Sequence, residues 1–262
     1  ANHLIGIDLP KENLGKCRRS GFELDVTYNN KFGVVNFTAN ANALFYKSKL
    51  LANGENAYPE SYMQRVGEKQ GQIFGYVADG LFQSQKEIDS YLSTTKIEGY
   101  VPQPGDIKYC DLNGDHILDG KDVKAIGNNA PLIEYGFYLG AEWKGLGFDA
   151  MFQGTGRYSA VLNTKSLYWP LINNTTISQE YYDNRWTPEN QDAKYPRLSS
   201  QSNENNYQTN TLWLADRSFL KLRSIELYYK FPQIWVKKSK ILSNAKIYVR
   251  GVDLLCFDKI NI

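Results

Sequence analysis

The sequence has few of the residues on which redox, metal and nucleic-acid-binding proteins depend. Its 262 residues include three cysteines, two histidines and two methionines, and the formal net charge is only +2. Cys17, Cys110 and Cys256 are far apart and form no CxxC pair, which excludes a thiolate metal site and a closed disulfide framework. We expect free, buried thiols. The near-balance of charge provides no broad basic surface, so we expect no nucleic acid partner.

The motifs of common catalytic sites are also missing. Only His3 and His116 could act as the base of a Ser-His-Asp triad, and no GxSxG, HExxH or phosphate-binding glycine loop is present. The sequence therefore predicts a protein that is not an enzyme, with a hydrolase as a remote alternative. No run approaches the ~18 apolar residues that a membrane-spanning helix needs, so a helical membrane protein is excluded.

Aromatic and amide side chains are abundant by contrast. Phe, Trp and Tyr make up 14% of the residues, with 19 Tyr, and there are 23 Asn but only nine Pro. Tyr is favoured in strands and Asn in turns. This composition favours strands joined by polar turns over a helix bundle.

Long stretches of the chain alternate strictly between apolar and polar residues. Residues 34–45 place Val and Phe on one face and Asn and Thr on the other, which is the pattern of a half-buried strand. Together with the preceding alternation, residues 21–45 predict a long hairpin that turns at Asn29, Asn30 and Lys31. Further strands are predicted at residues 135–143, 148–153, 218–231 and 246–255.

Two long polar segments, about residues 50–131 and 154–217, separate these strands. Tight turns at one end and long loops at the other are typical of an outer-membrane β-barrel. The strand predicted at residues 34–45, about 12 residues long, exceeds the ~5–6 residues of a typical globular strand and fits the ~9–11 residues of a tilted membrane-spanning strand. A soluble antiparallel sandwich also alternates and also carries long loops, so the pattern alone leaves both open. About six strands are too few for a closed barrel, which needs ~8 or more. We expect an incomplete barrel section with two open edges.

The sharpest chemical motif lies in the first long segment. Oxygen ligands recur at positions 1, 3, 5, 7, 9 and 12 of a loop, as in an EF-hand, and this spacing predicts one structural calcium ion. Position 12 is Asp rather than Glu, and position 6 is His116 where Gly is usual. The alternative is an Asx-rich turn whose carboxylates bind their own backbone amides. The predicted ligands are Asp111, Asn113, Asp115, the carbonyl of Ile117, Asp119 and Asp122.

Among the five tryptophans, Trp169 is the best candidate for contact with a substrate. It is flanked by Tyr168 and Pro170 in the middle of the second long segment. A Trp at a strand end would instead belong to the aromatic girdle of a barrel.

Several stretches, taken in order along the chain, resemble the SusC/RagA-type TonB-dependent outer-membrane transporters of Bacteroidetes. Each stretch alone is weak evidence for this resemblance, but together the stretches cover nearly the whole chain and their combination is specific. They include Gly-Tyr-Val-Ala-Asp-Gly-Leu-Phe at residues 75–82 and Arg-Trp-Thr-Pro-Glu-Asn at residues 185–190. The full set is residues 15–16, 20–24, 75–84, 104–115, 126–127, 131, 135–136, 152–154, 185–190, 195–198 and 212–227.

The resemblance implies an all-β antiparallel barrel section in the outer membrane. Residues 1–262 would be the C-terminal part of the barrel domain, without the N-terminal plug. The implied role is import of oligosaccharides or other nutrient oligomers, including peptides, with a SusD-type surface lipoprotein and with TonB, which would contact the missing N-terminal region. The alternative is a soluble extracellular glycan-binding β-protein with a calcium-stabilised loop.

In a barrel wall the alternation also assigns the two faces of the first strand pair. The apolar residues would face lipid and the amide and hydroxyl residues would face the lumen. A shift of one residue in register would exchange the two faces. The predicted lipid-facing residues are Val35, Phe37, Ala39, Ala41 and Phe45, and the lumen-facing residues are Asn36, Thr38, Asn40 and Asn42.

Overall fold

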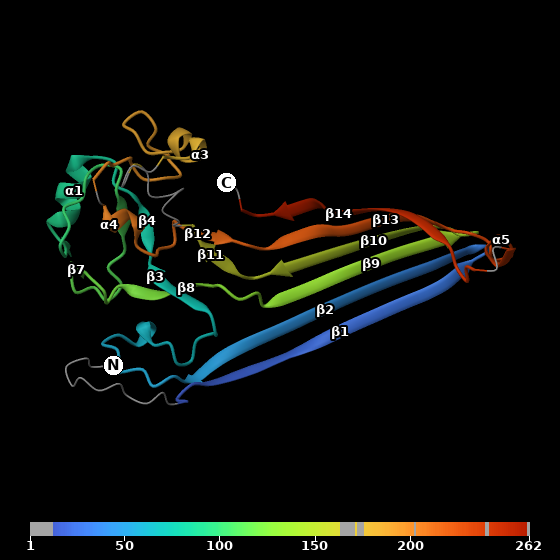
Figure 1. Ribbon diagram of the computed structural model, residues 1–262. Coiled ribbons are helices and arrows are strands. Elements are labelled where there is room, and N and C mark those ends of the chain that lie inside the picture. The colour runs from blue at the N-terminus through green and yellow to red at the C-terminus, as the bar shows by residue number, and fades with distance from the viewer. Residues whose placement is uncertain (1–12, 163–170, 172–175, 202, 239–240, 261–262) are drawn as a thin grey trace, which may run out of the picture.

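One antiparallel sheet of six long strands forms the main body of the computed structural model, which describes residues 13–162, 171, 176–201, 203–238 and 241–260. The strands lie in the order β1-β2-β9-β10-β13-β14 (Figure 1). The predicted strands are confirmed, and most are longer than the alternation indicated. Their bounds are β1 (Lys16–Phe32), β2 (Val35–Ala52), β9 (Ile133–Trp143), β10 (Leu146–Gly156), β13 (Phe219–Lys230) and β14 (Lys246–Asp258).

The first hairpin is present, but its turn was predicted at the wrong place. Asn29, Asn30 and Lys31 lie within β1 and pair with β2, and the chain turns at Gly33 and Val34. Gly33 adopts φ +63°, which Gly does without steric cost and which suits a two-residue hairpin turn. The pairing of β1 with β2 along their whole length therefore sets the position of the turn, although the Asn-Asn-Lys stretch favours a turn locally.

The register brings most of the apolar residues of the six strands to one face, here called the apolar face. In β2, Phe37 pairs with Ala141 and Ala41 with Phe137, and β9 continues the same face into β10. This face is not packed against a second sheet in the described residues. Large side chains on it stay exposed, among them Phe22, Leu24, Val26, Phe137, Leu139, Phe148, Leu227 and Val249.

A β-bulge in β13 explains why this strand alternates less cleanly in the sequence. Met151 and Phe152 are adjacent in β10 but pair with Ser224 and Leu222 of β13, so Arg223 is an extra residue in β13 relative to β10. A bulge adds one residue to one strand and so restores the alternation beyond it. Leu222 and Ile225, three positions apart, consequently both lie on the apolar face, opposite Phe152 and Ala150 of β10.

The two edges of the sheet are open. Within the described residues β1 pairs only with β2, and β14 only with β13. This confirms the expected incomplete section.

The expectation of buried thiols is wrong for two of the cysteines, because Cys17 lies on β1 and Cys256 on β14, the two uncovered edge strands, and both are exposed. Cys110 is partly buried.

The two long segments, residues 53–132 and 157–218, lie together at one end of the sheet (Figure 1) and are called the loop subdomain. Ser84 caps α1 by accepting a hydrogen bond from the Glu87 backbone amide. None of the helices in the described part of the chain is long and apolar enough to cross a membrane. The short elements are η2 (Ser61–Met63), β3 (Gln72–Tyr76), β4 (Ala78–Leu81), α1 (Gln85–Leu92), β5 (Lys96–Ile97), β6 (Ile107–Tyr109), β7 (Ile117–Leu118), β8 (Val123–Asn128), β11 (Ser159–Val161), α3 (Gln179–Asp183), α4 (Glu204–Tyr207) and β12 (Leu214–Asp216), with α5 (Gln233–Lys238) at the opposite end of the sheet.

Candidate functional site

The loop subdomain has an aromatic core of its own. Tyr181 stacks on Tyr195 with ring centroids 4.7 Å apart, and Trp213 stacks on Tyr195 and on Tyr207 at 5.9 and 6.0 Å. All four side chains are buried. Burial of such rings against one another stabilises a region that has little regular secondary structure. Leu81, Ile107 and Tyr109 of the first long segment belong to the same buried cluster, so the two segments are held as one packed unit rather than as separate loops.

Asp106 joins the two long segments. Its carboxylate is fully buried, and Oδ1 accepts hydrogen bonds from Arg197 Nε at 2.7 Å and from the amides of Asn203 and Asn206 at 3.0 Å. Oδ2 accepts from the Tyr100 hydroxyl at 2.6 Å and from the Gln103 backbone amide. A buried carboxylate is costly unless it is paired and hydrogen-bonded, and here both oxygens are satisfied. We call this arrangement the Asp106 clasp.

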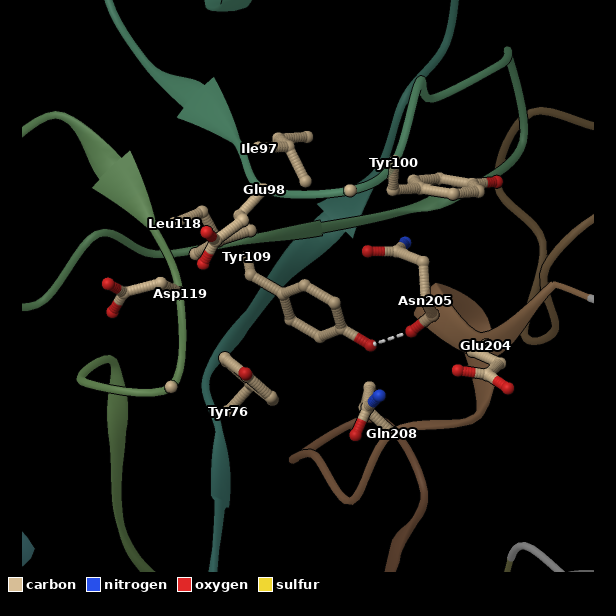
Figure 2. A pocket seen from close by; sticks show the side chains of 12 residues that line it. Tyr76, Ile97, Glu98, Tyr100, Tyr109, Leu118, Asp119, Glu204, Asn205 and Gln208 are labelled. Atoms are coloured by element: carbon tan, nitrogen blue, oxygen red, sulfur yellow. Dashed lines mark hydrogen bonds between the residues drawn. The ribbon is translucent and has the colours of Figure 1, made fainter.

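A pocket opens beside the clasp (Figure 2). It has a volume of about 250 Å³, and the ring of Tyr109 crosses its centre, where the hydroxyl donates to the Asn205 carbonyl. The Tyr76 and Tyr109 ring centroids are 5.0 Å apart. The lining residues are Tyr76, Ile97, Glu98, Gly99, Tyr100, Tyr109, Leu118, Asp119, Gly120, Glu204, Asn205 and Gln208.

The pocket offers ring faces, amides and carboxylates, and no Lys, Arg or His lines it. Burial, followed by the nearby Asp122 and Asp119 carboxylates, raises the pKa of Tyr76. Burial also raises the pKa of Tyr109 far above its ordinary value. Both phenols therefore stay protonated at neutral pH and act as neutral groups. Such a mixture of ring faces and hydrogen-bonding groups suits the binding of a polar organic ligand rather than covalent catalysis.

The predicted calcium loop borders this pocket through Asp119. Asp111 accepts hydrogen bonds from the backbone amides of Gly114 and His116, both at 2.8 Å. Asp122 is fully buried and accepts from the backbone amides of Leu112 and Asp119 at 2.8 and 3.0 Å. His116 adopts φ +63°, the conformation expected where a calcium loop usually has Gly.

Lys121 provides positive charge within the same loop. Its Nζ lies 3.0 Å from Asp115 Oδ2 and 3.3 Å from Asp119 Oδ2. The hydrogen bonds from Lys121 and Asn113 lower the pKa of Asp115, and Asp115 and Asp119 raise the pKa of Lys121. Among the described residues no three His, Cys, Asp or Glu side chains lie close enough to hold a metal ion. These hydrogen bonds are those of the alternative Asx-rich turn, and calcium binding stays a prediction. Trp169 lies outside the described residues.

The polar face of the sheet carries a second cluster, near the tight turns. Tyr228 of β13 reaches across β10 to donate a hydrogen bond to Glu142 Oε2 of β9 at 3.0 Å, and Lys230 pairs with the same oxygen. The intervening residue is Gly147, where a Cβ atom would lie 2.1 Å from the Tyr228 ring. Glu226 pairs with Lys246 and Arg250 of β14. On the face opposite the apolar one, ion pairs thus link β13 both to its neighbour β14 and, across β10, to β9.

Two of the three comparisons with known proteins found relatives of the chain. No family model matches the chain. Two TonB-dependent receptors of Formosa agariphila, P26 and P3, are 27% and 24% identical to it, each over 96% of this chain. The chain spans only about a quarter of their lengths, 27% and 25%.

Solved structures show the same relation in three dimensions. The RagAB peptide transporter matches over 99% of this chain and 28% of that chain, with 20% identity and a TM-score of 0.70. The same importer in its open-open state gives a TM-score of 0.69. The predicted resemblance to SusC/RagA-type TonB-dependent transporters is confirmed, and the fold is a section of the barrel of such proteins rather than a sandwich. These relatives are receptors and transporters, not enzymes, and belong to the outer membrane.

Two features of the site could not be found from the sequence. The carboxylate of Asp106 has partners 91 to 100 residues away in the chain. The pocket combines residues from five separate stretches between Tyr76 and Gln208. The motif at residues 104–115 contributed to the resemblance, but no local signal indicates the role of Asp106.

Proposed function

We propose that this chain forms part of the wall and the extracellular mouth of a TonB-dependent outer-membrane importer. The single observation that carries the proposal is the division of the six-stranded sheet into one apolar and one polar face, with a packed loop subdomain at one end. A six-stranded antiparallel sheet with an uncovered apolar face suits a lipid-facing barrel wall, because lipid would cover the exposed side chains. The open edges then require further strands, because unpaired backbone groups are costly in lipid.

The proposed cargo is an oligosaccharide or another nutrient oligomer such as a peptide. RagAB is named as a peptide transporter. The pocket of this chain provides tyrosine rings together with carboxylate and amide groups. Rings and polar groups of this kind can hold either a sugar unit or a peptide segment. The proposed partners are a SusD-type surface lipoprotein at the mouth and TonB, which supplies energy through parts of the protein beyond this section.

The chain would contribute the C-terminal part of the barrel domain, with the loop subdomain facing outward. Short turns lie on the periplasmic side of outer-membrane barrels and long loops on the outside. Calcium at residues 111–122 would be structural and would stiffen the mouth beside the pocket. Trp169, in the second long segment, is proposed as a further substrate contact.

The test is an uptake assay in the organism that carries the gene. Deletion of the full-length gene should abolish uptake of one class of labelled oligomer, oligosaccharide or peptide. The deletion strain is then complemented with the wild-type gene or with a gene that carries Glu98→Gln or Glu204→Gln, which alter the exposed acids of the pocket. Each variant should give several-fold lower uptake than the wild-type gene at equal protein level. Glu189→Gln, an exposed acid of the same subdomain outside the pocket, is the matched control. Undiminished uptake of every oligomer class in the deletion strain would contradict the proposal.

A further inference from the structure

The connection between β13 and β14 lies at the end of the sheet opposite the loop subdomain (Figure 1). It contains the short helix α5, and two large apolar side chains of this helix point away from the protein. Ile234 is 73% exposed and Trp235 is 60% exposed. Val236, the next residue, is only 5% exposed. The helix is therefore seated on the protein through one side, and its exposed apolar side chains are not the result of an unpacked segment.

The apolar face of the sheet continues into the segment that leads to α5. Tyr229 lies on that face opposite Leu146 and Ile247. Phe231 follows two residues later and packs edge-on against Tyr229, with ring centroids 5.3 Å apart. The Phe231 backbone amide donates to the Ala245 carbonyl at 3.0 Å, which closes the base of the connection. The apolar surface thus extends past the end of β13 to Phe231, two residues before α5 begins.

Positive charge accompanies this surface. Lys237 and Lys238 end α5, and both are exposed. Residues 231–245 contain no Asp or Glu. In the neighbouring turn, Lys144 Nζ lies 5.5 Å from the ring centroid of Trp143, which is 49% exposed on the same apolar face. Aromatic rings and lysines therefore gather at one level, at the end of the sheet.

We propose that α5 is an interfacial anchor that places Ile234 and Trp235 among the headgroups of the membrane leaflet at the turn end of the sheet. Lys237 and Lys238 would bind anionic phospholipid phosphates there. The proposal rests on the proposed function, because it needs the apolar face to lie in lipid. Its chemistry is that of interfacial helices, which combine Trp and aliphatic side chains with lysines.

The charges of Lys237 and Lys238 favour a membrane over a partner protein as the surface that α5 binds. A lysine near an anionic lipid surface favours the bound state by about fivefold. A partner protein would have to supply carboxylates to satisfy both lysines and also an apolar cavity for Trp235. The membrane supplies both requirements at the level where the sheet ends, and the apolar surface already leads there.

The experiment uses the full-length protein in lipid nanodiscs, with native cysteines replaced and an environment-sensitive fluorophore on one introduced cysteine. Ile234→Cys tests the anchor, Leu227→Cys tests the apolar face of the sheet, and Glu189→Cys in the loop subdomain is the aqueous control. Quenching is compared between lipids brominated near the headgroup and lipids brominated near the chain end. A second set of discs contains phosphatidylglycerol, with or without the Lys237→Glu and Lys238→Glu pair.

The anchor predicts strong quenching at position 234 by the shallow bromines and weak quenching by the deep ones. It also predicts that phosphatidylglycerol shifts the emission of the fluorophore at position 234 toward that of a lipid environment. This shift should be lost in the variant that carries both Lys237→Glu and Lys238→Glu. Water-like emission at 234 together with quenching at 227 would overturn the anchor and leave the barrel wall intact. Unquenched emission at 227 would overturn the proposed function, and the anchor with it. An unchanged response to phosphatidylglycerol in the charge-reversed pair would overturn the role of the lysines.

Discussion

Asp106 lies in the first long segment, and its side-chain partners Arg197, Asn203 and Asn206 lie in the second. The fully buried carboxylate holds the Arg197 guanidinium, which is itself largely buried. Replacement of one partner of a buried ion pair leaves the other charge uncompensated, at a cost of about 3 kcal/mol. The clasp should therefore determine whether the two segments stay together.

We predict that Asp106→Asn lowers the stability of the loop subdomain by about 3 kcal/mol. Limited proteolysis of the full-length protein in detergent should then cut between residues 157 and 218 much faster than in the wild type. The matched control is Asp79→Asn, which removes an exposed partner of Lys108 and should cost under about 1 kcal/mol. Equal cleavage of the two variants would show that the clasp is not the main link between the segments.

The residues of the predicted calcium loop give a second prediction. Calcium should bind to the full-length protein with a dissociation constant of ~10⁻⁴–10⁻³ M, because His116 occupies a strained position usually given to Gly. His116→Gly should bind more tightly, and Asp111→Ala should not bind. Isothermal titration of all three proteins is the measurement. Identical titrations in the three proteins would leave the loop as an Asx-rich turn held by Lys121.

At the scale of elements, alternation was enough to find all six strands of the sheet. Because successive side chains of a strand point to opposite faces, apolar residues at every second position indicate a strand with one apolar face. The bulge at Arg223 and the turn at Gly33 were not predictable in this way. Both depend on which strands pair and over what length, and local residue preferences carry no such information. The aromatic core of the loop subdomain depends in the same way on contacts that are distant in sequence.

Gly147 gives a prediction about one strand. The side chain of Tyr228 lies directly over it, so Gly147→Ala should displace the ring, break the hydrogen bond to Glu142 and lower the stability by about 1–3 kcal/mol. The control is Gly156→Ala in the same strand, where the nearest atom to the added Cβ is 3.8 Å away. Thermal unfolding in detergent measures both variants.

A double-mutant cycle separates packing from a general effect on the strand. If the ring of Tyr228 causes the clash, the destabilisation by Gly147→Ala should be largely absent in a Tyr228→Ala background. Additive losses of stability would contradict this explanation, because they would mean that Gly147 and Tyr228 act independently.

At the scale of the whole molecule, the sheet is open at both edges in the described residues, and we propose that further strands continue it on both sides. Edge strands β1 and β14 present unpaired backbone groups, and the apolar face carries exposed aromatic and aliphatic side chains. We predict that the 262-residue chain expressed alone is recovered only with detergent, and that it aggregates when the detergent is removed. Sedimentation before and after removal is the measurement. A monodisperse monomer in buffer would favour the soluble glycan-binding alternative.

The fold class followed from the alternation and the resemblance, but the candidate pocket did not. Alternation is a property of neighbouring residues, while the pocket requires Tyr76, Tyr109 and Glu204 to meet from distant parts of the chain. The predicted calcium loop at residues 111–122 contributes Asp119 to the lining of the pocket, and no pattern in the sequence indicates this proximity. Proximity of this kind depends on the packing of the two long segments against each other.

The central claim is that the apolar face lies in lipid and the polar face lines the lumen. The most direct test is a spin-label scan of residues 35–45, one position at a time, in the full-length protein in membranes. Oxygen accessibility should be high at Val35, Phe37, Ala39, Ala41 and Phe45 and low at Asn36, Thr38, Asn40 and Asn42, with a period of two. The opposite phase, or no alternation along the strand, would contradict the account.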